Sequence, residues 1–304
     1  MKNDIMYYYN MNINNIKEYN GNYYFTFNDS KYEFVIYNRD IRENEAIYML
    51  NRNMINNNIL VNKIILNKDN YVVTYINNIP YIMYIVYIDK NKNISLNDIA
   101  YLSNKKYMID NLLTRNNWDI LWSNKIDYFE YQMNQMGKKY PIVVDTFSYF
   151  ASLAENAISY AKNTMLEVKK ENEDDLVISH RKLDNSLESL YDPLNIIFDH
   201  KSRDIAEYIK LSFFKENKNI YNELDFYFKN NYYSLYGIRL LYSRIIYPSF
   251  YFDIYESIMQ GISKESDLLN IVTKINDYEL YLKDMYYYLR KFYDIPSIEW
   301  IIKN

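Results

Sequence analysis

The residues best suited to chemistry in this sequence are two histidines, and each ends a short apolar run. His180 ends the run Leu-Val-Ile-Ser-His, and His200 follows Asp199 at the end of Ile-Ile-Phe-Asp-His. A histidine beside a carboxylate can transfer protons, and an aspartate is a ligand that Mg²⁺ prefers. The same residues can also be structural, either as histidines hydrogen-bonded across the two runs or as an Asp199–His200 pair that binds no metal. Both interpretations stay open at this point.

The composition argues against several functional classes of protein. The chain has 304 residues, of which 49% are apolar and 24% charged, as in ordinary globular proteins. Its net charge of −4 argues against nucleic acid as a partner, because phosphate-binding surfaces need clustered Lys and Arg. With no cysteine and two histidines, thiol nucleophiles are excluded and a zinc site is not expected.

The N-terminus lacks the apolar core of a signal peptide, and the most apolar stretch, residues 79–88, is too short to cross a bilayer. We therefore expect a protein that is made and retained inside the cell, without a transmembrane segment.

The first 90 residues have the pattern of a β-rich lobe. Residues 22–38 alternate in polarity on both sides of Asn28-Asp29-Ser30, which predicts a hairpin. Residues 42–55 carry apolar side chains at helical spacing, and residues 59–88 read as three more strands.

From residue 91 the pattern becomes helical. Residues 94–136 contain two amphipathic segments, residues 145–163 form a strong helix, and the charged residues 169–175 read as a solvated loop. The three tryptophans lie at helical spacing among apolar residues, so we expect them in the core. We expect two domains, 1–90 and 91–304.

Four segments in order resemble the spore-coat kinase-like proteins, the YutH and CotS group, which are distant relatives of aminoglycoside and choline phosphotransferases. They read FSYFASLAENAISYA at residues 147–161, FDHKSRDIAEYI at 198–209, RLLYSRIIYPSFYFD at 239–253 and IPSIEWI at 295–301. The resemblance covers roughly residues 100–304. It implies an α+β, bilobal, protein-kinase-like fold (aminoglycoside phosphotransferase-like), with a β-rich N-lobe and a helical C-lobe.

The resemblance also implies roles for the residues around Asp199. Asp199 takes the position of the metal-binding aspartate at the strand end, if Mg²⁺ is bound. Asp204 takes that of a structural helix aspartate. From the residues themselves, Ser202 could cap the next helix, and Arg203 could pair with Glu207 four residues later on the surface.

The catalytic loop implied by the resemblance is degenerate. The catalytic carboxylate belongs two residues after His180, where the sequence has Lys182, and the metal-binding Asn belongs at Leu187. Asp184 and Asn185 lie near these positions but are displaced along the loop, and a displacement of about 1 Å can cost about a hundredfold in rate. A further option is that Lys182 pairs with Asp199 in place of a metal ion.

The features that bind phosphate are also missing. The first hairpin turns on Asn28-Asp29-Ser30 without glycine, and the following strand has no Lys within residues 33–37. Glu43 and Glu45 on the next helix have no evident partner, although Arg39 is near in sequence.

The resemblance therefore favours a catalytically inactive pseudokinase scaffold in spore coat assembly, from a low-GC, spore-forming bacterium. Its partners would be other spore coat proteins, its location the mother-cell cytoplasm and the spore coat, and it would need no cofactor. The alternative is an active phosphotransferase that uses Mg-ATP on a small molecule or a coat protein. A third option follows from the 38 tyrosines, which either reflect A/T-rich codons or become cross-linked in the coat.

Overall fold

The computed structural model describes residues 1–87, 92–136 and 139–303. These residues form two compact units, one of Met1–Thr114 with Ile178–Phe198 and one of Arg115–Val177 with Asp199–Asn304. The predicted domain boundary at 90/91 lies outside the described residues. The two units are not separated at a single point of the chain, because residues Ile178–Phe198, which include the loop after His180, belong to the first unit.

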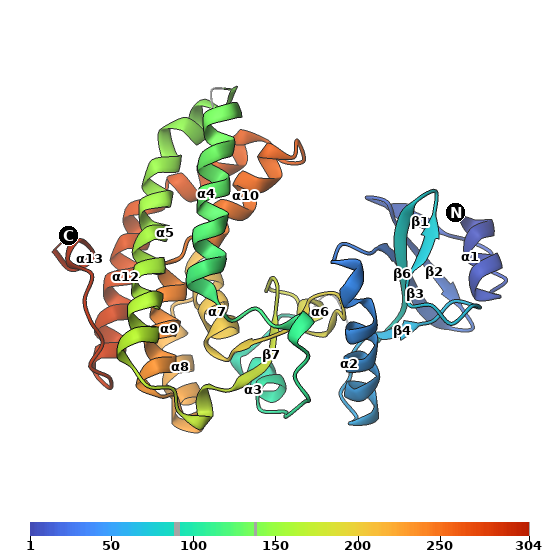
Figure 1. Cartoon of the computed structure of the whole chain (residues 1–304), viewed down its shortest axis with the longest axis horizontal. Helices are drawn as coiled ribbons and strands as arrows, with labels where there is room; N and C mark the ends of the chain where they lie inside the picture. The colour runs from blue at the N-terminus through green and yellow to red at the C-terminus, as the bar shows by residue number, and fades with distance from the viewer. Residues whose placement is uncertain (88–91, 137–138, 304) are drawn as a thin grey trace. The chain divides into compact units, whose positions relative to one another are not determined.

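The first unit is built on a six-stranded antiparallel sheet (Figure 1). Its main path has the order β1-β2-β3-β6-β4, and β5 pairs with β6 beside β4. The strands are β1 (Lys17–Tyr19), β2 (Asn22–Phe27), β3 (Ser30–Ile36), β4 (Lys63–Ile65), β5 (Thr74–Ile76) and β6 (Ile79–Val86). The predicted hairpin and the three later strands are confirmed.

Three of the sheet's hairpins turn through two residues with positive φ. These pairs are Asn20-Gly21 (φ 50° and 74°), Asn28-Asp29 (47° and 59°) and Asn77-Asn78 (51° and 65°). Such turns match the twist of the strands that they join, and Asn and Asp tolerate left-handed backbone better than other non-glycine residues. The abundant asparagines therefore replace glycine at most of these turns.

The sheet presents two different faces. Side chains of directly paired residues share a face, so Lys17, Tyr24, Glu33 and Tyr84 form one row across four strands. The opposite face packs on helix α1 (Lys2–Tyr9) through a buried apolar cluster. That cluster contains Ile5, Tyr9, Ile13, Phe25, Tyr32, Phe34, Ile76, Tyr81 and Met83.

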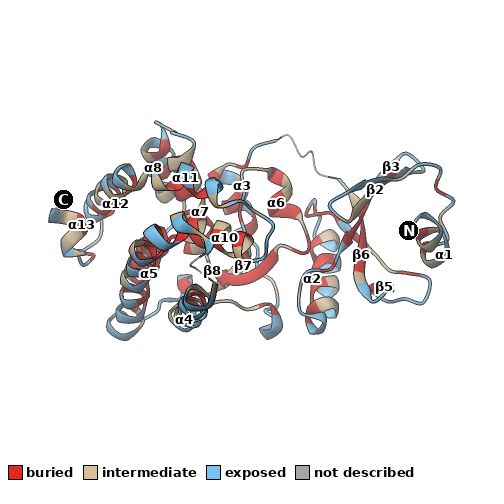
Figure 2. Ribbon diagram, turned by 90° about the horizontal axis from the view of Figure 1, so that it is seen from above, coloured by how far each residue is buried: buried red, intermediate tan, exposed pale blue. Residues whose placement is uncertain are grey.

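Among the described residues, the first unit also contains three short helices and most of two short strands (Figure 1). The helices are α2 (Asn44–Asn56), α3 (Leu96–Ser103) and α6 (Leu187–Tyr191), with 3-10 turns at Ile41–Glu43 and Asn111–Leu113. Strands β7 (Leu176–His180) and β8 (Ile196–His200) pair in a separate two-stranded sheet. As Figure 2 shows, β8 is buried along its length, as the continuous apolar run predicts.

The second unit is helical. It contains α4 (Trp118–Met136), α5 (Pro141–Glu167), α7 (Ser202–Phe214), α8 (Ile220–Asn230), α9 (Leu235–Ile246), α10 (Ser249–Met259), α11 (Leu269–Val272), α12 (Ile275–Arg290) and α13 (Glu299–Lys303), with 3-10 turns at Asn172–Asp174 and Glu265–Leu268. Helix α9 packs on α5 and α7 (Figure 1) and is buried on every side, consistent with its central place. The long helix predicted at 145–163 is confirmed within α5.

Three of the four family-like segments meet in this unit. The Tyr160 hydroxyl on α5 donates to the carbonyl of Pro296 at 3.0 Å, and the Trp300 indole donates to Asn156 at 3.4 Å. The Tyr160 ring also packs edge-on against Tyr242 of α9. These segments are therefore joined by their side chains, so their order in the sequence reflects one packing arrangement.

Within the described residues, no helix is both long and apolar enough to cross a bilayer.

Candidate functional site

Asp199 lies at the end of β8 with no exposed surface. The Trp118 indole donates to both of its carboxylate oxygens at 3.0 Å, and the His200 backbone amide donates to Oδ1 at 2.7 Å. The Arg203 guanidinium completes the set with an ion pair of 2.6 Å to Oδ2. Both oxygens are thus engaged by protein donors, and the negative charge has a cation beside it. Arg203 and Glu207 were expected to pair on the surface, but both side chains are largely buried. Arg203 forms its ion pair with Asp199, and its charge also helps to lower the pKa of Glu207.

The Trp118 indole is fixed by aromatic packing. Its ring stacks on Trp122 at 5.4 Å between centroids, and Trp122 stacks on Tyr247 at 4.3 Å. The Arg244 guanidinium lies 4.9 Å from the centre of the Trp118 ring. Trp118 and Trp122 are core residues, as predicted, whereas Trp300 is only partly buried, contrary to the prediction. The hydrogen bond from Trp118 to Asp199 spans 81 positions and has no local signal in the sequence.

Glu207 pairs with Lys210 and Arg244, each with a nitrogen 2.9 Å from Oε1. Burial raises the pKa of Glu207, but the charges of Lys210 and Arg244 outweigh it and lower that pKa to about 2. Burial lowers the pKa of Lys210 to about 8, although Glu207 partly offsets this effect. The Lys210 ammonium also donates to Ser249 at 2.6 Å. This cluster joins α7, α9 and α10.

His200 is buried and pairs with Asp174, not with Asp199. Its Nε2 lies 3.1 Å from Asp174 Oδ1, and its Nδ1 accepts the Ser202 backbone amide at 3.1 Å. A ring whose Nδ1 accepts must carry its proton on Nε2 when neutral, so both nitrogens have structural roles. Burial raises the pKa of Asp174, but hydrogen bonds from His200 and Ser234 outweigh it and leave that pKa below its usual value.

Two expectations near His200 are therefore corrected. The predicted cap by Ser202 is wrong: helix α7 begins at Ser202, whose hydroxyl donates to the Gly237 carbonyl at 2.6 Å, while His200 receives the orphan amide. The predicted solvated loop at 169–175 contains Asp174, which is 4% exposed and holds His200. Asp204 is also buried, in the first turn of α7.

His180 belongs to the first unit and is buried at the end of β7. Its Nε2 donates to the Leu190 carbonyl at 2.9 Å, which fixes the ring against helix α6. Both histidines are thus buried and hydrogen-bonded, and the bonds of His180 to Leu190 and of His200 to Asp174 do not run between the two short strands.

The loop after His180 is held by Asn195 and presents no converging carboxylates. Asn195 accepts the Lys182 amide at 2.9 Å and donates to the Lys182 carbonyl at 2.6 Å. Asp184 is exposed and accepts both the amide and the hydroxyl of Ser186 at 2.7 Å, which positions the start of α6. Leu187, which the resemblance aligns with a metal-binding Asn, is a buried apolar residue. Across the described ranges, no group of three His, Cys, Asp or Glu side chains could hold a metal ion.

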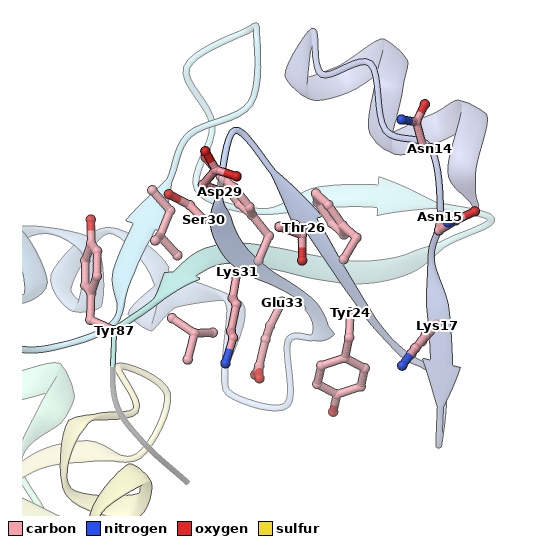
Figure 3. Close-up of a pocket in the computed structure, with 14 residues that line it drawn as sticks. Asn14, Asn15, Lys17, Tyr24, Thr26, Asp29, Ser30, Lys31, Glu33 and Tyr87 are labelled. Carbon is pink, nitrogen blue, oxygen red and sulfur yellow. The ribbon is translucent and has the colours of Figure 1, made fainter.

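The sheet of the first unit bears a broad hollow on the face opposite α1, with a volume of about 1140 Å³ (Figure 3). Lys17, Tyr24, Lys31 and Glu33 point into the same side of the sheet in this view. Lys31 lies two residues before Glu33 and therefore on the same face of β3. Strand β3 thus carries a lysine on this face, although residues 33–37, where a phosphate-binding lysine was sought, contain none. The register, rather than a motif, would have identified it.

The inner part of this face is acidic. Glu33 is buried in the middle of β3, and Tyr84 pairs with it on β6. Burial raises the pKa of Asp192 to about 6, and the neighbouring charges of Glu188 and Glu33 add to this effect. Burial raises the pKa of the Tyr84 hydroxyl, and the charges of the same three carboxylates raise it further. Helix α6 and the turn after it therefore approach the sheet here and place their carboxylates beside Glu33 and Tyr84.

Arg39 is the main cation of this region. It forms a buried ion pair of 2.6 Å with Glu43, so this glutamate has the partner that the sequence left open. The same guanidinium donates to the carbonyls of Leu194 and Ile196 at 3.2 and 2.7 Å. Arg39 thus joins the first turn before α2 to strand β8 within the first unit.

The chain matches the family model "Spore coat putative kinase YutH" over residues 2–286. It is 30% identical over 211 residues to the endospore coat-associated protein YutH of Bacillus subtilis (strain 168). That match covers 62% of this chain and 62% of the Bacillus protein, so the chain spans somewhat less than two thirds of the relative's length.

Solved structures with a similar fold are phosphotransferases. The aminoglycoside phosphotransferase of Alicyclobacillus acidocaldarius superposes with a TM-score of 0.66 at 9% identity, covering 93% of this chain and 94% of that one. A spectinomycin phosphotransferase solved with ADP and spectinomycin gives 0.58 at 11% identity, covering 99% and 95%. At such identities the likeness shows the fold, and the predicted kinase-like α+β class is confirmed. With its β-rich first unit, its helical second unit and a family match that spans nearly all of its length, this chain belongs to the YutH family of spore coat kinase-like proteins.

Proposed function

We propose that this chain is a catalytically inactive, kinase-like scaffold that acts in spore coat assembly through contacts with other coat proteins. The observation that carries the proposal is the state of Asp199, whose two oxygens accept from Trp118 and pair with Arg203. Magnesium demands near-ideal octahedral oxygen ligation and gives up its own water reluctantly. Binding at Asp199 would require displacing an internal cation and two hydrogen bonds from a buried group.

The degenerate loop supports the same proposal. Lys182 stands where a carboxylate would orient the attacking hydroxyl, and Leu187 has no lone pair for a metal ion. Phosphoryl transfer depends on positioning and on charge neutralisation, and both are missing at these positions. The acidic residues around Tyr84 further disfavour a triphosphate on the inner face of the sheet.

A direct test is calorimetric titration of the whole chain with Mg-ATP. We expect no saturable heat and no ADP formation at micromolar protein concentrations. Saturable binding that weakens in an Asp199→Asn variant with an unchanged circular dichroism spectrum would overturn the proposal and favour the Mg-ATP-dependent phosphotransferase.

The role in the coat is tested by complementation in a spore-forming host that lacks this chain. The Asp184→Asn variant removes the nearest candidate base but keeps an oxygen that can accept the Ser186 amide. We expect this variant and the wild type to restore the same coat composition. Failure of the folded variant alone would mean that coat assembly needs phosphotransfer.

A further inference from the structure

The outer half of the sheet face opposite α1 combines open space with unpaired positive charge. The hollow of about 1140 Å³ is lined by residues of β1, β2, β3 and β6, by Tyr87, and by Asn14 and Asn15 ahead of β1 (Figure 3). Lys17 and Lys31 are exposed, and neither makes a hydrogen bond or ion pair with the part of the chain that the structure describes. Tyr24 provides a partly buried aromatic surface between them.

The strand register fixes the spacing of the two lysines. Lys17 pairs with Tyr24, and Lys31 pairs with Thr26, two residues further along the same central strand. The two Cα atoms are therefore separated by two strand spacings and two residues, roughly 12 Å in total. In an extended peptide, residues four apart are separated by about 13 Å and point to the same side.

The distribution of charge selects the kind of anion. Asp29 at the rim and the buried Glu33 flank Lys31 in sequence, so concentrated negative charge beside Lys31 meets repulsion. Single carboxylates about 13 Å apart can each contact one lysine and avoid both acidic side chains. The hollow is thus better suited to a peptide with separated carboxylates than to a triphosphate.

We propose that this hollow binds an extended acidic segment of a partner protein, with two carboxylates four residues apart that pair with Lys17 and Lys31. The inference rests on the proposed scaffold function and names the chemistry of its partner. Tyr24 would cover the apolar part of the segment between the two carboxylates.

Fluorescence anisotropy of the whole chain tests this with a labelled nine-residue peptide of Ser and Thr that carries two glutamates four residues apart. We expect saturable binding that weakens as salt is raised, because exposed ion pairs are screened. The Lys17→Glu/Lys31→Glu double variant should bind at least about tenfold more weakly, as expected for the loss of two exposed pairs. A peptide with glutamines in place of both glutamates should bind as weakly.

The matched control is Lys63→Glu, which reverses an exposed lysine on β4 that does not line the hollow. Equal binding by the wild type and the double variant, or equal weakening by Lys63→Glu, would overturn the proposal.

Competition with ATP separates this inference from the proposed function. Peptide binding that Mg-ATP does not displace supports both. If no peptide and no Mg-ATP bind, the acidic-segment proposal fails and the inactive scaffold stands. If Mg-ATP binding depends on Lys31 and the peptide does not bind, both proposals fail.

Discussion

The charged residues of the two units are used in opposite ways. In the helical unit, the carboxylates of Asp199 and Glu207 are each paired with cations, and these pairs together with hydrogen bonds from Trp118 and to Ser249 connect α4, α7, α9 and α10. On the sheet of the first unit, Lys17 and Lys31 face an open hollow. In kinase-like enzymes, the aspartate at the position of Asp199 holds metal and a strand lysine contacts phosphate. Here the Asp199 carboxylate is buried and engaged by Trp118 and Arg203, whereas both lysines are exposed at the hollow.

The strongest test of the comparison removes the central carboxylate of the helical unit. Glu207→Ala leaves Lys210 and Arg244 buried without their shared anion. Breaking a buried pair by removing one partner costs about 3–5 kcal/mol in the free energy of unfolding. Urea denaturation followed by circular dichroism should show a loss of this size.

Its control is Glu299→Ala, which removes an exposed partner of Lys303 and should cost less than about 1 kcal/mol. If the two variants lose the same stability, the helical unit does not depend on its buried charges.

A second test concerns the acidic inner face of the sheet. Because Asp192 has a pKa of about 6 when folded, against about 3.9 in unfolded chains, the folded state binds more protons between these values. The contribution of Asp192 to the free energy of unfolding is therefore fully present below pH 4 and is lost as the pH rises through 6. Asp192→Asn keeps an acceptor for the Leu194 amide and removes this penalty. It should stabilise the protein by about 1–2 kcal/mol at pH 7 and leave it unchanged at pH 4.

Thermal unfolding of the wild type and Asp192→Asn across pH 4 to 7 measures this difference. A stability gap that does not change with pH would show that the carboxylate is not strained by its neighbours.

The smallest expected change in stability concerns the two exposed lysines of the sheet. Lys17→Ala/Lys31→Ala should change the free energy of unfolding by less than about 0.5 kcal/mol, because neither ammonium has a partner among the described residues. Chemical denaturation measures it. A loss above about 1 kcal/mol would mean that these lysines stabilise the sheet and are not held available for a ligand.

Much of the secondary structure followed from periodicity. The hairpin at residues 22–38 alternates strictly, and the helix around residues 145–163 has a continuous apolar face, so both were found where expected. Helix α1 and strand β1 were missed. Strand β1 has three exposed residues and no apolar pattern of its own, and it exists because β2 offers it a pairing edge.

At the site, the sequence identified the residues but not their partners. It located the strand end at Asp199, the loop with Lys182 and Leu187, and two histidines whose burial was one of two interpretations left open. It paired Arg203 with Glu207 and His200 with Asp199, because these neighbours are close along the chain. The folded chain instead places Arg203 on Asp199 and His200 on Asp174.

The sequence by itself therefore determined the family, the order of the elements and the presence of Lys182 where the resemblance implies a carboxylate, since each depends on residue identity or local period. Only the tertiary structure decided what holds Asp199 and which lysines remain open. The physical reason is that a buried charge is hydrogen-bonded by the donors that lie beside it in the folded chain. Trp118 is such a donor for Asp199, although 81 positions separate the two residues in the sequence.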